Sequence, residues 1–256
     1  MTIDLARAAE IQRNALADWV RAVAAGARTA ELFDRDGVTA CAVPACPNRS
    51  IVNSVTYTHG EGLVRLYDEL RDFYERLGIE AWTVWVPDFD PGTVEALEGA
   101  GHTFDGKPTA MVLELDGWEP PPIGDLDWDR DGDPETFGRI NDLAYGYTPE
   151  TGYARAMSQP VDGYTIYRAR ADGETACVVG TLEHDRGDLG IYFVATVPEH
   201  RGKGLTSRLM AVALSEASER GLVTSSLQAS AMGQPIYANL GYVGYFRLHL
   251  YERRGT

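Results

Sequence analysis

Cysteine is scarce in this chain, and the few cysteines limit its chemistry. The 256 residues contain three of them, Cys41, Cys46 and Cys177. Three cysteines cannot all pair with one another, and Cys41 and Cys46 lack the matching second pair that a zinc site needs. We therefore expect buried or idle thiols and no bound metal.

Long apolar runs are also missing. No segment approaches the roughly 20 consecutive apolar residues that a membrane-spanning helix needs. The alanine-rich stretch in the first 30 residues is interrupted by Asp18, Arg21 and Arg28. The sequence therefore predicts a cytoplasmic protein with no membrane partner.

Basic residues are outnumbered by acidic ones. The chain has 23 Lys and Arg against 38 Asp and Glu, a net charge of -15 at pH 7. This balance disfavours binding to nucleic acid phosphates or anionic lipid. It suits a cationic acceptor, or it serves only solubility. With 44% hydrophobic and 24% charged residues, the composition is that of a folded globular protein of one large or two modest domains.

Three consecutive prolines, Pro120 to Pro122, mark a break, because proline is excluded from helix interiors and central strands. We place a linker at 117–124, between domains at 1–116 and 125–256. Hydrophobic periodicity upstream predicts strands at 38–43, 51–57, 81–86 and 110–115 and helices at 63–77 and 91–100. Downstream it predicts strands at 165–169, 176–183, 189–196, 223–228 and 245–251, and helices at 134–144, from 205 to about Gly221, and at 234–240.

The two halves align on their glycines. The run His59-Gly60-Glu61-Gly62-Leu63 precedes the first long helix of its half as Arg201-Gly202-Lys203-Gly204-Leu205 precedes that of the second. Helix-ending glycines follow at similar distances in both. This repetition predicts a duplicated domain, with chance agreement of helix punctuation as the alternative.

The run at 201–205 has the features of an anion site. Gly202 and Gly204 let the backbone turn tightly, and the helix that begins near Leu205 offers unpaired amides and the positive end of its dipole. Arg201 and Lys203 add positive charge to an otherwise acidic chain. The alternative is a tight strand-to-helix turn with solvated basic side chains.

Residues 194–205 resemble the signature of the GNAT superfamily of N-acetyltransferases, in which a strand ends at a proline and an Arg/Gln-x-x-Gly-x-Gly/Ala loop opens a helix. Here Arg201, Gly204 and Thr206 stand at the motif positions, and Thr206 departs from the usual small residue. The resemblance implies that the loop binds the pyrophosphate of acetyl-CoA and that the preceding strand pairs with the pantetheine arm. The implied binding residues are Val194, Ala195, Thr196, Arg201, Gly202, Lys203, Gly204, Leu205 and Thr206.

Residues 227–242 look like the second GNAT motif, and the resemblance implies that Tyr237 protonates the departing CoA thiolate. The alternative is a core aromatic, although the counterpart in the first half is Leu97, which has no hydroxyl. Ser230 stands where many relatives have an asparagine that bonds the cofactor, or it is an ordinary loop serine.

The general base is not marked by a motif, because Gly190 occupies the strand position at which many relatives have a glutamate. Glu183 and Asp188 are the carboxylates near it in sequence, with His184 between them, and we take both as catalytic candidates. The alternatives are that these side chains face solvent, that water relays the proton, or that the acceptor arrives neutral.

The helix predicted at 134–144 is followed by three candidates for the acceptor wall, chosen by their position in the family: Tyr145, Tyr147 and Glu150. An acidic and aromatic lining suits an amine. Scattered surface tyrosines are the alternative.

Together these features predict an α/β (α+β) protein of two tandem GNAT-like domains, each a mixed, mostly antiparallel sheet flanked by helices. The first is a degenerate copy, because His59 and Glu61 replace Arg201 and Lys203. The predicted activity is direct acetyl transfer from acetyl-CoA to a primary amine of a small-molecule or peptide acceptor, by a monomer or homodimer. A noncatalytic acyl-CoA sensor is the alternative, and a nucleoside-triphosphate loop is not matched.

Overall fold

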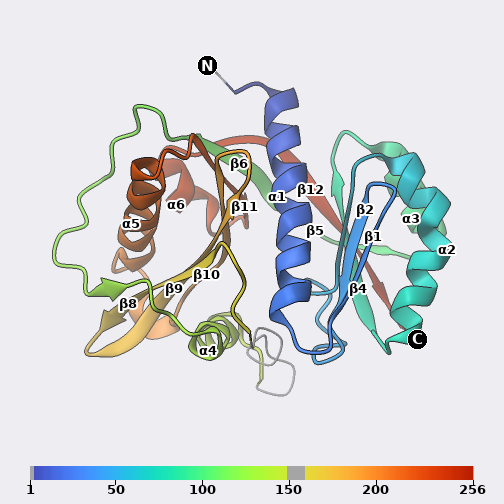
Figure 1. Ribbon diagram of the computed structural model, residues 1–256, viewed down its shortest axis with the longest axis horizontal. Helices are drawn as coiled ribbons and strands as arrows, with labels where there is room; N and C mark the ends of the chain where they lie inside the picture. The colour runs from blue at the N-terminus through green and yellow to red at the C-terminus, as the bar shows by residue number, and fades with distance from the viewer. Residues whose placement is uncertain (1–2, 149–158, 256) are drawn as a thin grey trace.

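The computed structural model describes residues 3–148 and 159–255. The first half contains α1 Leu5–Gly26, β1 Glu31–Arg35, β2 Val38–Ala42, β3 Ser54–Tyr57, α2 Gly60–Arg76, β4 Ala81–Pro87, α3 Pro91–Gly99, β5 Thr103–Gly106 and β6 Thr109–Glu114 (Figure 1). The second half contains β7 Trp128–Asp129, α4 Pro134–Tyr145, β8 Tyr164–Ala171, β9 Glu174–His184, β10 Asp188–Thr196, α5 Leu205–Glu219, β11 Thr224–Ala229, α6 Gln234–Asn239 and β12 Val243–Arg254.

The strands of the described residues form one mixed sheet. Their order is β1-β2-β3-β4-β12-β6-β11-β10-β9-β8-β7, and β5 also pairs with β12. The pairs β3 with β4 and β10 with β11 are parallel, and the other strand pairs are antiparallel. The predicted α/β fold with a mixed, mostly antiparallel sheet and flanking helices is confirmed. The prediction of a separate sheet in each half is corrected, because one sheet runs through both.

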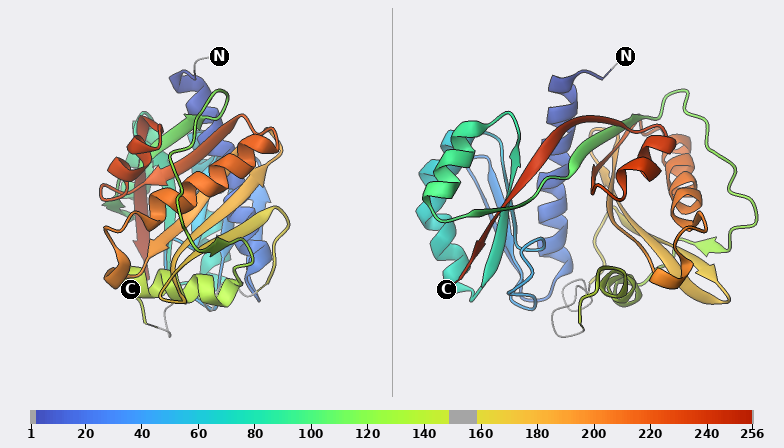
Figure 2. Two further views of the ribbon diagram at one scale, coloured as in Figure 1. Left: turned by 90° about the vertical axis from the view of Figure 1, so that its left-hand side faces the viewer. Right: turned by 180° about the vertical axis from the view of Figure 1, so that it is seen from behind.

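Two strands that cross between the halves cause this continuity. β6 precedes the predicted linker in sequence, yet it pairs with β11 along its whole length. β12 pairs through its first residues with β6 and through its last residues, from Leu248 to Arg254, with β4. Figure 2 shows β12, in red, passing from the side of α5 to the side of α2. The strands of the two halves therefore pair with one another where the halves meet, and no unpaired sheet edge is left there. The boundary at 117–124 stays a prediction, and this segment contains no helix or strand.

Helix α1 was not predicted, and it stands between the two groups of helices (Figures 1 and 2). The Asp4 carboxylate caps its start by accepting a hydrogen bond from the Arg7 amide, at 2.8 Å. Its alanines and large apolar side chains pack on strands of both halves: α1 contacts β2 and β3 on one side and β10 and β11 on the other. Among the described residues, no helix is both long and apolar enough to span a bilayer.

The other predicted helices and strands agree with the structure to within a few residues. The strands β1, β5 and β7 were missed together with α1. Each half thus contains two parallel strands connected by a helix, β3–α2–β4 and β10–α5–β11. The second of these units contains the candidate site.

Candidate functional site

The candidate site lies where β10 and β11 separate. The two parallel strands are paired from Asp188 with Thr224 to Gly190 with Ser226, and no pair follows beyond these among the described residues. A bulge between Tyr192 and Ala195 interrupts the pairing of β10 with β9. Phe193 takes a left-handed conformation there, with φ of 51°. The diverging strands leave a gap that opens toward the start of α5.

A cleft of about 410 Å³ occupies this gap. Its size suits a ligand arm rather than a single water molecule. It is lined by Ala144, Tyr145, Val194, Ala195, Thr196, His200, Arg201, Gly202, Gly204, Leu205, Thr206, Ser207, Ser230, Met232, Gly233, Ile236 and Tyr237. Both sequence motifs, separated by a helix and a strand, thus contribute to one cavity.

The loop before α5 has the geometry of an anion site. Gly202 and Gly204 have φ of 74° and 73°, which disfavours side chains, and an added Cβ at either meets nothing within 4 Å. Gly204 is the N-cap of α5, and no side chain of the described residues caps this helix. Its first amides therefore point into the cleft mouth with the positive end of the helix dipole.

The two basic side chains of this loop are placed differently. Arg201 lines the cleft, and its guanidinium donates to the carbonyls of Ala144, at 2.6 Å, and Thr196, at 3.3 Å. Lys203 is exposed, lies outside the lining residues, and places its Nζ 3.1 Å from Nδ1 of His200. Arg201 is therefore fixed at the cleft wall, whereas Lys203 contributes charge from the surface.

The departure from the motif at Thr206 is accommodated. Its hydroxyl lies 2.8 Å from the hydroxyl of Thr196 and 3.8 Å from Sγ of Cys177. Because these contacts turn the side chain toward β10, it leaves the turn at Gly204 open.

Tyr237 is brought to the cleft by the short helix α6. Burial, with smaller contributions from Tyr145 and Cys177, raises its pKa above the ordinary value of a phenol. The hydroxyl is therefore protonated at neutral pH and can donate a proton. Ser230 also lines the cleft, and its Oγ accepts a hydrogen bond from the Gly233 amide at 3.2 Å.

Of the three residues predicted for the acceptor wall, Tyr145 lines the cleft. Its hydroxyl donates to the Val194 carbonyl at 3.0 Å. Tyr147 lies outside the cleft, where the Arg49 guanidinium stacks 3.9 Å from its ring centre. Glu150 lies outside the described residues. Their roles with an acceptor stay predictions.

The two carboxylates predicted as catalytic candidates do not line the cleft. Glu183 forms an ion pair with Arg220 at 2.7 Å. Asp188 is buried and accepts hydrogen bonds from Thr224 and Ser226 at 2.7 and 2.6 Å. Burial raises the pKa of Asp188, although the two hydroxyl groups oppose this. Both side chains have partners within the protein, and their catalytic roles stay predictions.

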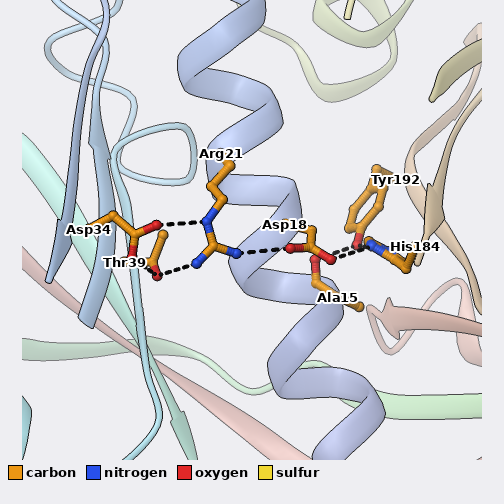
Figure 3. Close-up of polar contacts among 7 residues, drawn as sticks. All are labelled: Ala15, Asp18, Arg21, Asp34, Thr39, His184 and Tyr192. Carbon is orange, nitrogen blue, oxygen red and sulfur yellow. Dashed lines mark hydrogen bonds and ion pairs between the residues drawn. The ribbon is translucent and has the colours of Figure 1, made fainter. Parts of the chain in front are cut away.

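The sequence did not reveal a polar chain that crosses from α1 to β10 (Figure 3). The Asp18 carboxylate lies 2.9 Å from Nδ1 of His184, and Nε2 of His184 lies 3.3 Å from the Tyr192 hydroxyl. Tyr192 also donates to the Ala15 carbonyl at 2.8 Å. On the other side, Arg21 joins Asp18 to Asp34 of β1.

This row of hydrogen-bonded side chains lies next to Gly190. Tyr192 is two residues further along the same strand, so its side chain points to the face that a side chain at 190 would occupy. A carboxylate, an imidazole and a phenol that are joined by hydrogen bonds can take up a proton and pass it on. Burial raises the pKa of Asp18, but the hydrogen bond and charge of His184, with Arg21, outweigh it and hold that pKa below its usual range.

Residues 188–244 match the family model of the acetyltransferase (GNAT) domain. Over nearly the whole chain, the fold is similar to a GCN5-related N-acetyltransferase from Kribbella flavida, with a TM-score of 0.66, 16% identity, and coverage of 93% of this chain and 96% of that one. It is similar to a GCN5-related N-acetyltransferase from Sphaerobacter thermophilus, with 0.61, 17%, 87% and 82% for the same measures. A tandem GNAT protein from the clavulanic acid biosynthesis pathway gives 0.58, 16%, 96% and 96%. No curated protein matches by sequence.

These likenesses establish the fold and a match to the GNAT acetyltransferase domain over residues 188–244, which supply most of the residues that line the cleft. In the described part of the chain, no group of three or more His, Cys, Asp or Glu side chains is placed to hold a metal ion.

Proposed function

We propose that this protein is an N-acetyltransferase that moves the acetyl group of acetyl-CoA directly to a primary amine. One observation carries the proposal. The loop at 201–206, except for Lys203, lines the same cleft as Tyr237. The resemblance assigns the loop to pyrophosphate binding and Tyr237 to thiolate protonation. A cleft lined both by an anion-binding loop and by a neutral phenol suits thioester aminolysis.

In the proposed reaction the amine attacks the thioester carbonyl in a ternary complex. The carbon–sulfur bond of the tetrahedral intermediate then breaks, and the CoA thiolate takes the proton of Tyr237. The raised pKa of Tyr237 keeps that proton in place until the thiolate forms. Arg201, the α5 amides and the β10 backbone between Val194 and Thr196 hold the donor.

The attacking amine also has to lose a proton, and we assign this step to His184. Asp18 holds Nδ1 of His184, so Nε2 faces the hydroxyl of Tyr192. Tyr192 lies two residues before Val194, which lines the cleft. Neither His184 nor Tyr192 lines the cleft, so in this proposal a water molecule carries the amine proton to the Tyr192 oxygen, while the Tyr192 hydroxyl turns from the Ala15 carbonyl and gives its own proton to Nε2. The resulting imidazolium is stabilised by the Asp18 carboxylate.

In this proposal residues 1–116 are a degenerate copy of residues 125–256, because His59 and Glu61 replace the basic residues of the phosphate loop. The competing function is a noncatalytic acyl-CoA sensor, which shares the cleft and lacks turnover. The absence of a carboxylate at Gly190 favours a sensor only if His184 is inert.

Turnover separates the two functions. Primary amines are screened with acetyl-CoA for release of free thiol, and the best acceptor is then tested with Tyr237→Phe. We expect turnover in the unaltered protein and a kcat about 100-fold lower in the variant, with an unchanged Kd for acetyl-CoA. Tyr245→Phe, outside the cleft, should match the unaltered protein. Tight acetyl-CoA binding without thiol release for any amine would identify a sensor.

A further inference from the structure

A second cavity lies in the first half of the chain, between the parallel strands β3 and β4. These strands are paired at Ser54 with Thr83 and at Val55 with Val84, and they separate beyond these positions. The space between them, with α1 as one wall, encloses about 500 Å³. This volume exceeds that of the cleft beside α5 and falls within the range of small-molecule sites.

The floor of this cavity is apolar. Leu16, Trp85, Phe246 and Leu248 are buried, belong to one hydrophobic cluster, and line the cavity. Phe89 stands at the rim with 53% of its surface exposed and meets Phe246 edge to face, with ring centres 5.3 Å apart. An aromatic ring or a branched aliphatic group placed here would gain apolar contacts on several sides.

Several polar side chains in the walls already have hydrogen-bond partners within the protein. Trp85 donates to the Ser54 hydroxyl at 2.9 Å, and Tyr57 donates to the Asp90 carboxylate at 2.7 Å. Gln12 is buried and donates to the carbonyls of Met111 and Leu227. These groups shape the cavity but have little hydrogen-bonding capacity left for a ligand.

Arg13 differs from them. It projects from α1, is partly buried, and lines this cavity and the neighbouring cavity of about 320 Å³. No hydrogen bond or ion pair joins its guanidinium to any of the residues 3–148 and 159–255. Its nearest acidic neighbour on the helix, Glu10, is paired with Arg7 and Arg186 instead. Five donors in a planar fork are therefore available, and this geometry matches a carboxylate.

The charges at the rim argue against a CoA pyrophosphate here. His59 and Glu61 line the cavity at the positions that correspond to Arg201 and Lys203 of the second half. Glu61 would repel a second or third negative charge, whereas a single carboxylate can be paired by Arg13 alone. The ligand that fits is small, singly charged and apolar at its other end.

We propose that this cavity is a binding site for a small organic acid, with its carboxylate on Arg13 and its aromatic or branched aliphatic body on Trp85 and Phe246. The site is separate from the cleft beside α5, and it does not depend on the acetyltransferase function.

The test uses phenylacetate, indole-3-acetate and 3-methylbutanoate as probes, with phenylacetamide as the uncharged counterpart of the first. At about ten times its Kd, a bound acid raises Tm by about 3 °C. We expect this rise with at least one acid and none with phenylacetamide. Arg13→Gln should remove it, and so should Ala9→Phe, which fills the cavity and leaves Arg13 in place. Arg7→Gln, on the same helix but outside the cavity lining, should keep it.

The proposal would be overturned by the absence of a Tm rise with any of the three acids, or by an equal rise in Arg13→Gln. Displacement of the acid by acetyl-CoA would also overturn it, because it would place the acid in the cleft beside α5. The variant Gly204→Glu, designed to block acetyl-CoA, should still bind the acid.

Discussion

The imidazole of His184 fills the space that a side chain at Gly190 would need. A Cβ added at Gly190 would lie 2.5 Å from Nε2 of His184 and 2.6 Å from the hydroxyl oxygen of Tyr192. Both distances are shorter than any ordinary contact, so a residue other than glycine requires one of these groups to move. The resemblance implies a glutamate at this position in many GNAT proteins, and here a histidine and a tyrosine fill the space.

Substitution of Gly190 should consequently destabilise the protein instead of restoring a base. We expect Gly190→Ala and Gly190→Glu to lower the free energy of unfolding by about 1–3 kcal/mol, with the larger loss for glutamate. Urea denaturation measures the change. Gly99→Ala, at an exposed position with nothing within 4 Å of the added Cβ, should cause no loss. An active and equally stable Gly190→Glu would show that His184 does not hold this space.

The pair of Asp18 and His184 should matter for turnover more than for donor binding. Asp18→Asn keeps the size of the side chain but removes the charge that stabilises an imidazolium. We expect a kcat about 100-fold lower with the acceptor found by the amine screen, and an unchanged Tm rise with acetyl-CoA.

Asp34→Asn is the matched control, because Asp34 is the other carboxylate bonded to Arg21 and does not touch His184. Its kcat should stay within about threefold of the unaltered protein. Equal losses in the two variants would assign Asp18 a structural role only.

His102 should make stability depend on pH in the acidic range. The side chain is buried between Tyr67 and the Tyr251 carbonyl, and burial, with a contribution from Arg253, lowers its pKa from 6.5 to about 4. Between these pH values the unfolded chain binds a proton that the folded chain does not. The free energy of unfolding therefore falls as the pH drops from about 6.5 to about 4.

The size of this effect follows from the shift. It amounts to about 3 kcal/mol across the window, at 1.36 kcal/mol per pKa unit. Urea denaturation at pH 7 and pH 4 measures it. His102→Gln, which cannot titrate, should lose about 3 kcal/mol less than the unaltered protein over this interval. The same loss in both proteins would contradict the account of His102.

The sequence predicted what depends on local pattern. Apolar spacing located the helix that became α5, and the glycines at 202 and 204 located the turn before it, because helix periodicity and left-handed backbone are properties of short segments. The motif around Tyr237 likewise placed a short helix, α6, at the cleft.

What the sequence could not predict depends on contacts between distant residues. The single sheet arises because β6 and β12 pair across the halves, and their local pattern is the same whichever strand they join. The link from Asp18 to His184 spans 166 positions, and only the fold brings them together. Helix α1 differs from these, because its buried residues recur at helical spacing and its local pattern is therefore sufficient to predict a helix.

The loop before α5 should hold the pyrophosphate of acetyl-CoA, and calorimetric titration of acetyl-CoA into the protein measures this binding. We predict saturable binding at one site and its loss in Gly204→Glu, which adds a carboxylate at the start of α5. Gly78→Glu is the matched control, since Gly78 also has positive φ, at 67°, with nothing near an added Cβ, and it lies at the end of α2. It should bind acetyl-CoA as the unaltered protein does. Equal binding in Gly204→Glu, or no binding in the unaltered protein, would contradict the account.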